Sequence, residues 1–126
     1  MIYSDLEIGD KMLKLRLDSR GCVALEKKLG KAPLTIFMNI ENELPLLGDM
    51  ITILQAALQK FQTGYTMDKT YDLYDEYVEG GGTQTDFIKV VMDIFKVSGF
   101  FKEPTEADES IVDAEVIEEK KQLAAK

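Results

Sequence analysis

The stretch LPLLGDMITILQAALQKF, residues Leu44–Phe61, is the most apolar long run of the chain, and the rest is organised around it. Its large apolar residues recur at intervals of three and four, the spacing of an amphipathic helix. They are Leu47, Met50, Ile51, Leu54, Leu58 and Phe61. Pro45 suits the first turn of such a helix, and Gly64 suits a left-handed end. Ile53 and Ala57 widen the stripe, which predicts a core helix packed against more than one neighbour.

On the N-terminal side, residues Ile2–Leu17 have the pattern of a β-hairpin. Gly9-Asp10 is a two-residue turn signal, and Lys11–Leu17 alternates apolar with charged residues. Because an isolated hairpin is marginally stable in water, we expect it to cover helices or to join another sheet. Pairing of its edges with another subunit is the alternative.

A helix is predicted between the hairpin and Gly30, with Asp18 or Ser19 as its N-terminal cap. The single cysteine, Cys22, falls on the buried side of this helix together with Leu25. We interpret Cys22 as a small core residue, because a reactive thiol needs a nearby cation or base.

Three further helices are expected. A short one follows Ala32 and points three side chains inward, those of Leu34, Phe37 and Met38. Another spans Thr66–Glu79 and stops at three glycines; its predicted apolar stripe is Met67, Tyr71, Tyr74 and Val78. The last begins at a capping-box-like Thr83–Asp86 and stops at Gly99. Phe100-Phe101 then needs a pocket or a partner.

Composition and charge narrow the function classes. The chain has 126 residues with 45% hydrophobic and 30% charged, which suits one domain of an ordinary globular protein. No apolar run is long enough for a membrane span, and the N-terminal residues do not resemble a signal peptide, so we expect a cytoplasmic protein. The net charge is −8, and no basic patch suggests nucleic-acid binding.

Much of the acidic excess lies near the C-terminus. From Glu103 onward there are eight acidic residues and three lysines. We therefore predict a domain over residues 1–102 and a disordered acidic tail over residues 103–126. Two apolar pairs in this tail, Ile111-Val112 and Val116-Ile117, offer a segment that folds on a partner. The predicted fold class is thus mainly α, with about five helices and an N-terminal β-hairpin, in a small α+β domain.

The sequence contains almost none of the residues and motifs that are typical of catalytic sites. There is no histidine, no phosphate-binding loop, no HExxH motif and no EF-hand spacing. The acidic residues Asp72, Asp75, Glu76 and Glu79 could line a metal-carboxylate helix, but such helices normally add a Glu-x-x-His pair. A solvated helix face is the simpler interpretation. We therefore predict no enzyme activity, no catalytic or metal-binding residue and no cofactor.

We expect instead a protein that binds other proteins. The candidate contact residues are the tyrosines of the Thr66–Glu79 helix and the phenylalanine pair after the last helix, namely Tyr71, Tyr74, Tyr77, Phe100 and Phe101. The tyrosines could form a binding strip or pack in the core with their hydroxyls at the rim.

The stretch LKLRLDSRGCVALEKKLG, residues Leu13–Gly30, resembles the tail assembly chaperones of long-tailed bacteriophages and prophages. The resemblance continues through Pro33-Leu34, the apolar helix, the Tyr- and Asp-rich helix before the glycines, and SGFF at 98–101. It covers about residues 10–101. It implies a non-catalytic assembly factor that binds the tape-measure protein while tail-tube subunits polymerise around it, and that is absent from the finished virion. The tail-tube protein is a candidate second partner, which in this family is recruited by the extension of a longer form.

The resemblance also implies that some members exist in a second, longer form made by ribosomal frameshifting. Glu119-Lys120-Lys121 requires an A-rich codon run that suits such slippage, although Glu26-Lys27-Lys28 has the same property. Self-association stays open at this stage. The alternatives are a structural virion component or connector, and an acidic inhibitor or nucleic-acid mimic.

Overall fold

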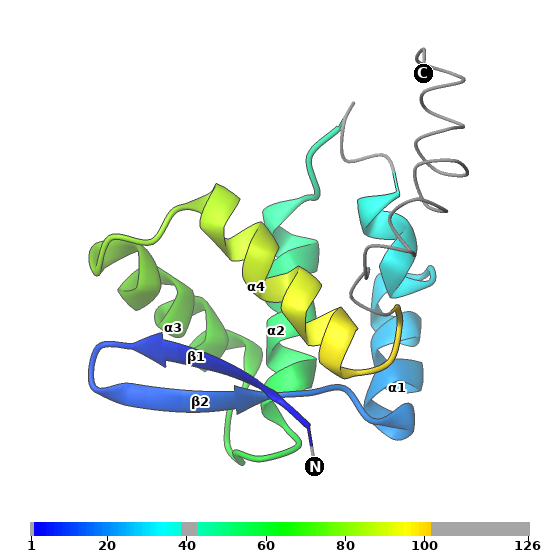
Figure 1. Cartoon of the computed structure of the whole chain (residues 1–126), viewed down its shortest axis with the longest axis horizontal. Coiled ribbons are helices and arrows are strands. Elements are labelled where there is room, and N and C mark those ends of the chain that lie inside the picture. The colour runs from blue at the N-terminus through cyan, green and yellow to red at the C-terminus, as the bar shows by residue number, and fades with distance from the viewer. Residues whose placement is uncertain (1, 39–42, 102–126) are drawn as a thin grey trace, which may run out of the picture.

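Helix α2 (Leu47–Leu58) lies at the centre of the computed structural model, which describes residues 2–38 and 43–101. The other elements are, in chain order, β1 (Ser4–Ile8), β2 (Lys11–Leu15), α1 (Ser19–Leu29), the 3₁₀ helix η1 (Pro33–Phe37), α3 (Met67–Glu79) and α4 (Gln84–Val97). Figure 1 shows the hairpin crossing one side of the helices, with α4 passing in front of α2. The predicted α+β fold with an N-terminal hairpin is confirmed. The expected boundary at residue 102 and the acidic tail lie outside the described residues.

The packing of α2 closes both edges of its apolar stripe. The helix contacts α1, α3, α4 and β2. Its buried residues are Met50, Ile51, Ile53, Leu54, Ala57 and Leu58. Ile53 and Ala57, which define the second edge, are both 0% exposed. Among the described residues, the chain itself therefore covers both edges of the apolar stripe of α2.

Both ends of α2 differ from the sequence prediction. The cap is Leu46, so Pro45 precedes the helix instead of occupying its first turn. The helix ends at Leu58, well before Gly64, which adopts a positive φ of 87° in the loop beyond. Beyond this end, the Gln62 side chain donates to the Leu58 carbonyl at 2.9 Å and also bonds Lys14, so it joins the end of α2 to the hairpin.

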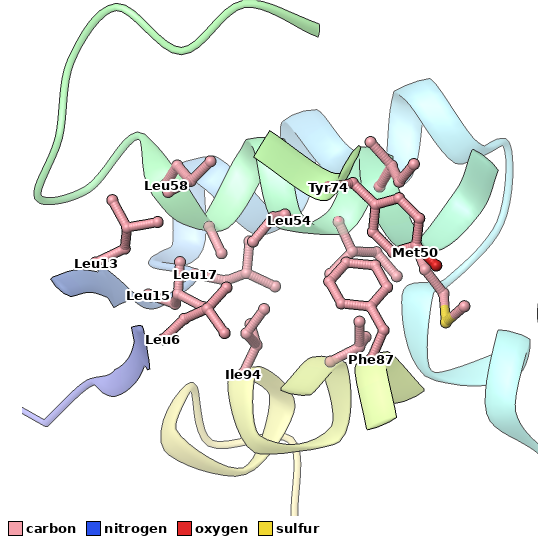
Figure 2. Close-up of a cluster of buried hydrophobic side chains, with 14 of the residues drawn as sticks. Leu6, Leu13, Leu15, Leu17, Met50, Leu54, Leu58, Tyr74, Phe87 and Ile94 are labelled. Carbon is pink, nitrogen blue, oxygen red and sulfur yellow. The ribbon is translucent and has the colours of Figure 1, made fainter. Parts of the chain in front are cut away.

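The hairpin presents an apolar face to the helices. Its strands are antiparallel, with Leu6 opposite Leu13 and Ser4 opposite Leu15, and Gly9 of the turn has a φ of 62°. Figure 2 shows Leu6, Leu13 and Leu15 directed toward Leu54 of α2 and Ile94 of α4. The predicted placement of the hairpin over the helices is confirmed.

The outer edge of β2 is occupied by the chain itself. The Gln62 side chain accepts from the Lys14 N–H at 2.8 Å and donates to the Lys14 carbonyl at 2.9 Å. Two residues further on, just past β2, the Arg16 N–H donates to the Ala57 carbonyl at 3.2 Å. The chain itself therefore occupies this edge at Lys14 and Arg16.

The helix termini follow the predicted caps. The Asp18 carboxylate accepts from the Gly21 N–H at 2.8 Å, and Gly30 ends α1 with a φ of 75°. Thr66 caps α3, and Thr83 forms a reciprocal capping box with Asp86 at the start of α4. Such caps satisfy backbone N–H groups that have no partner inside the helix.

In the segment after α1, one of the three side chains predicted to face the core is exposed instead. Phe37 is buried and packs edge-on against Phe95, with ring centroids 5.4 Å apart. Met38, expected to face inward, is 77% exposed. The cause is the 3₁₀ geometry of η1, in which residues three apart lie above one another, so Leu34 and Phe37 share the inner side and Met38 turns away.

Candidate partner-binding surface

The five candidate contact residues fall into three different environments. Tyr71 is exposed, with 46% of its surface accessible, whereas Tyr74 is buried at 8%. Tyr77, Phe100 and Phe101 are half-buried and pack against the core. The structure therefore does not gather the five residues into one strip, and only Tyr71 stands out from the surface.

Tyr74 and Tyr77 belong to an aromatic cluster between α3 and α4. The ring of Phe87 lies 4.9 Å from that of Tyr74 and 5.7 Å from that of Tyr77. Burial raises the pKa of both tyrosine hydroxyls above the ordinary value, and for Tyr77 the charge of Asp86 adds to the effect. Their role in this environment is to hold the two helices together.

The phenylalanine pair closes the end of α4. The Phe100 ring lies 4.8 Å from that of Phe95, and the Phe100 N–H donates to the Phe95 carbonyl at 3.0 Å. Gly99 permits this reversal with a φ of 90°. The pocket that the sequence required for Phe100 is thus supplied by its own helix.

The buried stripe of α3 is rotated relative to the predicted one. Thr70, Leu73 and Tyr74 are buried, whereas Tyr71 and Val78 are exposed at 46% and 44%. Thr70 tolerates complete burial because its hydroxyl donates to the Thr66 carbonyl at 2.8 Å. Since a satisfied hydroxyl carries little desolvation cost, a threonine can take an inward position that the sequence pattern assigned to tyrosine.

The rotation leaves one continuous exposed surface on α3, which we call the α3 face. It consists of six exposed residues: Asp68, Tyr71, Asp72, Asp75, Val78 and Glu79. At 3.6 residues per turn they occupy a sector of about 120°. Tyr71 and Val78, two turns apart, form its apolar edge, and the four carboxylates form the remainder.

The carboxylates of the α3 face are available for external cations. None of the four makes an ion pair with the parts of the chain that the structure describes. Glu76, which the sequence grouped with them, points instead to the hairpin and binds Lys11 at 2.9 Å. Within residues 2–38 and 43–101, no group of three potential ligands is placed to hold a metal ion.

A second exposed apolar area lies beside α2 and was missed from the sequence. Leu44 and Leu46 are 62% and 67% exposed, and they line a hollow of about 150 Å³ together with Lys31 and Ile36. Leu44 is the first residue of the stretch predicted as the core helix but was not among its predicted buried residues. It precedes α2, which begins at Leu47.

Cys22 lies half-buried near the start of α1. Burial, with a further contribution from the charge of Glu26, raises the pKa of its thiol. The raised pKa disfavours the nucleophilic thiolate. The predicted core position is not found, because Cys22 is only half-buried, whereas Leu25 is the residue of α1 that is buried.

The hairpin and the helices on which it packs make the molecule a small α+β domain. Its α3 face is acidic and turned outward. The chain belongs to DUF6096, a family of unknown function, which it matches over residues 3–119. No curated protein and no solved structure matches it. In the described portion of the chain, no helix has the length and apolar character to cross a membrane.

Proposed function

We propose that this protein is a non-catalytic tail assembly chaperone of a long-tailed bacteriophage or prophage. In this role it binds the tape-measure protein in the cytoplasm of the bacterial host while the tail-tube protein assembles, and it is absent from the mature virion. The sequence resemblance over about residues 10–101 supports the class of protein. The α3 face is the structural observation that supports a binding site.

The chemistry of the α3 face suits a helical client. A tape-measure protein is a long helical chain whose exposed apolar stripes favour aggregation unless they are covered. Tyr71 and Val78 are spaced by seven residues, the repeat with which an amphipathic helix presents its own apolar residues. The neighbouring carboxylates favour a client with lysine or arginine beside its apolar stripe and disfavour an acidic one.

The enclosed core of the chaperone complements this role. Since the apolar stripe of α2 is covered by its own chain, we expect the client to bind outside the body and to leave the fold unchanged. The net charge of −8 helps to keep a complex with an apolar client in solution.

Co-expression with the tape-measure protein of the same phage tests the proposal. We expect the tape-measure protein to become soluble and to co-purify with this chain. The double variant Tyr71→Ala with Val78→Ala should lose this effect while keeping its circular dichroism spectrum. Met12→Ala, which removes a somewhat more exposed apolar side chain from the hairpin, is the control and should retain it.

Two results would contradict the proposal. One is a tape-measure protein that stays insoluble with the unchanged chain present. The other is detection of this chain by mass spectrometry in purified particles, which would identify a structural virion component.

A further inference from the structure

The outer side of α1 is a shallow, open surface that the described residues leave uncovered. Ser19, Arg20, Val23, Ala24 and Lys27 line this surface, which we call the α1 slot, around a volume of about 390 Å³. Val23 is 50% exposed at its centre. Since Arg20 and Lys27 lie one turn before and one turn after Val23, the slot is apolar in the middle and positively charged at both ends.

The cations of the α1 slot have no counterpart in the described structure. Neither Arg20 nor Lys27 forms an ion pair with residues 2–38 or 43–101. Lys28 on the same helix adds a third positive charge, against one negative charge from Glu26. In a chain with a net charge of −8, α1 is therefore a basic surface, and charge complementarity favours an acidic occupant.

The described part of the chain ends beside this slot. Ser98, Gly99 and Phe100 line a hollow of about 460 Å³ together with Ser19 and Cys22 at the start of α1. Ser19 also lines the α1 slot, so the two hollows are adjacent. The described chain therefore ends close to the N-terminal turn of α1, where Asp18 caps the helix and Arg20 provides the nearest cation of the slot.

The sequence beyond Phe101 contains a segment of matching chemistry. Residues 107–119, ADESIVDAEVIEE, include six acidic residues, no basic residue and four large aliphatic ones, Ile111, Val112, Val116 and Ile117. The family match also extends to residue 119, well past the described body. The ten residues from Phe101 to Ile111 span up to about 33 Å when extended, twice the roughly 16 Å length of α1.

We propose that segment 107–119 of the same chain docks on the α1 slot, placing its aliphatic residues over Val23 and its carboxylates near Arg20 and Lys27. The exposed ion pairs contribute little individually. Because the segment is tethered beside the slot, its effective concentration is on the order of millimolar, so a weak contact is sufficient. The α1 slot and segment 107–119 then shield each other until a partner of either one separates them. This inference does not depend on the proposed chaperone role.

Paramagnetic relaxation enhancement on the full chain tests the docking. A nitroxide is attached at Ser110→Cys in a Cys22→Ser background, which leaves every aliphatic residue of the segment in place. We expect selective loss of amide signal intensity for residues 19–28, with the signals of the α3 face preserved. The double variant Arg20→Glu with Lys27→Glu should abolish the loss.

A matched control separates local from general charge effects. Lys69→Glu with Lys89→Glu makes the same change in net charge on exposed lysines of α3 and α4 and should retain the signal loss on α1. A mixture of isotope-labelled chain without the nitroxide and unlabelled chain with it should show no loss. Four results would overturn the proposal: an absent loss, a loss spread over other faces, persistence in Arg20→Glu with Lys27→Glu, and a loss in the mixture, which would identify a second copy as the occupant.

Discussion

At the scale of single residues, Asp18 links the stability of α1 to pH. Its carboxylate caps the helix through the Gly21 N–H and lies 3.4 Å from the Lys60 ammonium group. The backbone bond from Gly21 is the main reason that the pKa of Asp18 lies below its ordinary value of 3.8. Since the folded-state pKa is below the unfolded one, the carboxylate stabilises the fold above the unfolded value, and this contribution is lost as the pH falls through the folded value.

Asp18→Ala should therefore destabilise the protein in a pH-dependent way. We expect a loss of about 1 kcal/mol in the free energy of unfolding at pH 7, a typical value for an N-cap. The difference from the unchanged protein should shrink as the pH is lowered through and below 3.8. Urea unfolding of both proteins at several pH values measures it. A difference that stays constant with pH would show that the carboxylate charge is not involved.

The inward position of Thr70 is a residue-scale feature that the sequence pattern could not reveal. Apolar side chains occur on more than one side of α3, so periodicity alone allowed either Tyr71 or Thr70 to face the core. The hydrogen bond from Thr70 to the Thr66 carbonyl removes the usual objection to burying a hydroxyl. The solvated acidic side of α3, with Asp72, Asp75 and Glu79, was expected from the sequence, but its apolar edge was missed because Tyr71 and Val78 had been assigned to the buried stripe.

At the scale of elements, the glycine run after α3 contains positions with different requirements. A Cβ atom at Gly82 would lie 2.5 Å from the Tyr77 ring, whereas one at Gly80 would meet no atom closer than 3.5 Å. Position 81 requires glycine for another reason, because its backbone has a positive φ of 107°. The run thus ends α3 and also lets the α3–α4 connection pass directly over an aromatic ring.

Gly82→Ala should accordingly destabilise the fold, and Gly80→Ala should be tolerated. Displacing the Tyr77 ring disturbs its packing on Phe87, and overpacking of this kind costs about 1–3 kcal/mol. Thermal unfolding followed by circular dichroism compares the two variants. Equal midpoints for them would show that the close approach of Gly82 to Tyr77 does not constrain the connection.

Local chemistry explains which elements were predictable. The hairpin turn and the caps at Asp18, Thr66 and Thr83 depend on neighbouring residues, and all were identified from the sequence. The end of α2 at Leu58 was not, because the apolar pattern continues to Phe61. The contact of Gln62 with Lys14 just beyond that end joins residues far apart in the sequence, and such contacts leave no signal in a local pattern.

At the scale of the whole molecule, Arg16 joins the N-terminal and C-terminal parts of the described body. Its Nη1 atom donates to the Ile2 carbonyl at 2.9 Å and to the Val97 carbonyl at 2.8 Å. The next residue continues the connection, since the Leu17 N–H donates to the Ser98 hydroxyl at 2.8 Å. These bonds hold the hairpin against the end of α4.

Arg16→Ala should lower the free energy of unfolding by about 2 kcal/mol, because hydrogen bonds from a charged donor contribute about 1.5–3 kcal/mol. Lys89→Ala, which removes an exposed positive charge from α4, should change stability by less than about 0.5 kcal/mol. Chemical denaturation of both variants gives the comparison. Similar losses in the two would mean that Arg16 contributes only its charge.

The enclosure of α2 has a consequence for how the protein is synthesised. On the ribosome, α2 is completed before α3 and α4, which later cover one side of it. At about 5–20 residues per second, translation of residues 59–97 takes about 2–8 s. During that interval the nascent chain exposes an apolar helical stripe on the side that α3 and α4 will cover. During its own synthesis, this protein therefore exposes an apolar helix that must be protected from aggregation. This is the same protection that we propose it gives to the helices of the tape-measure protein.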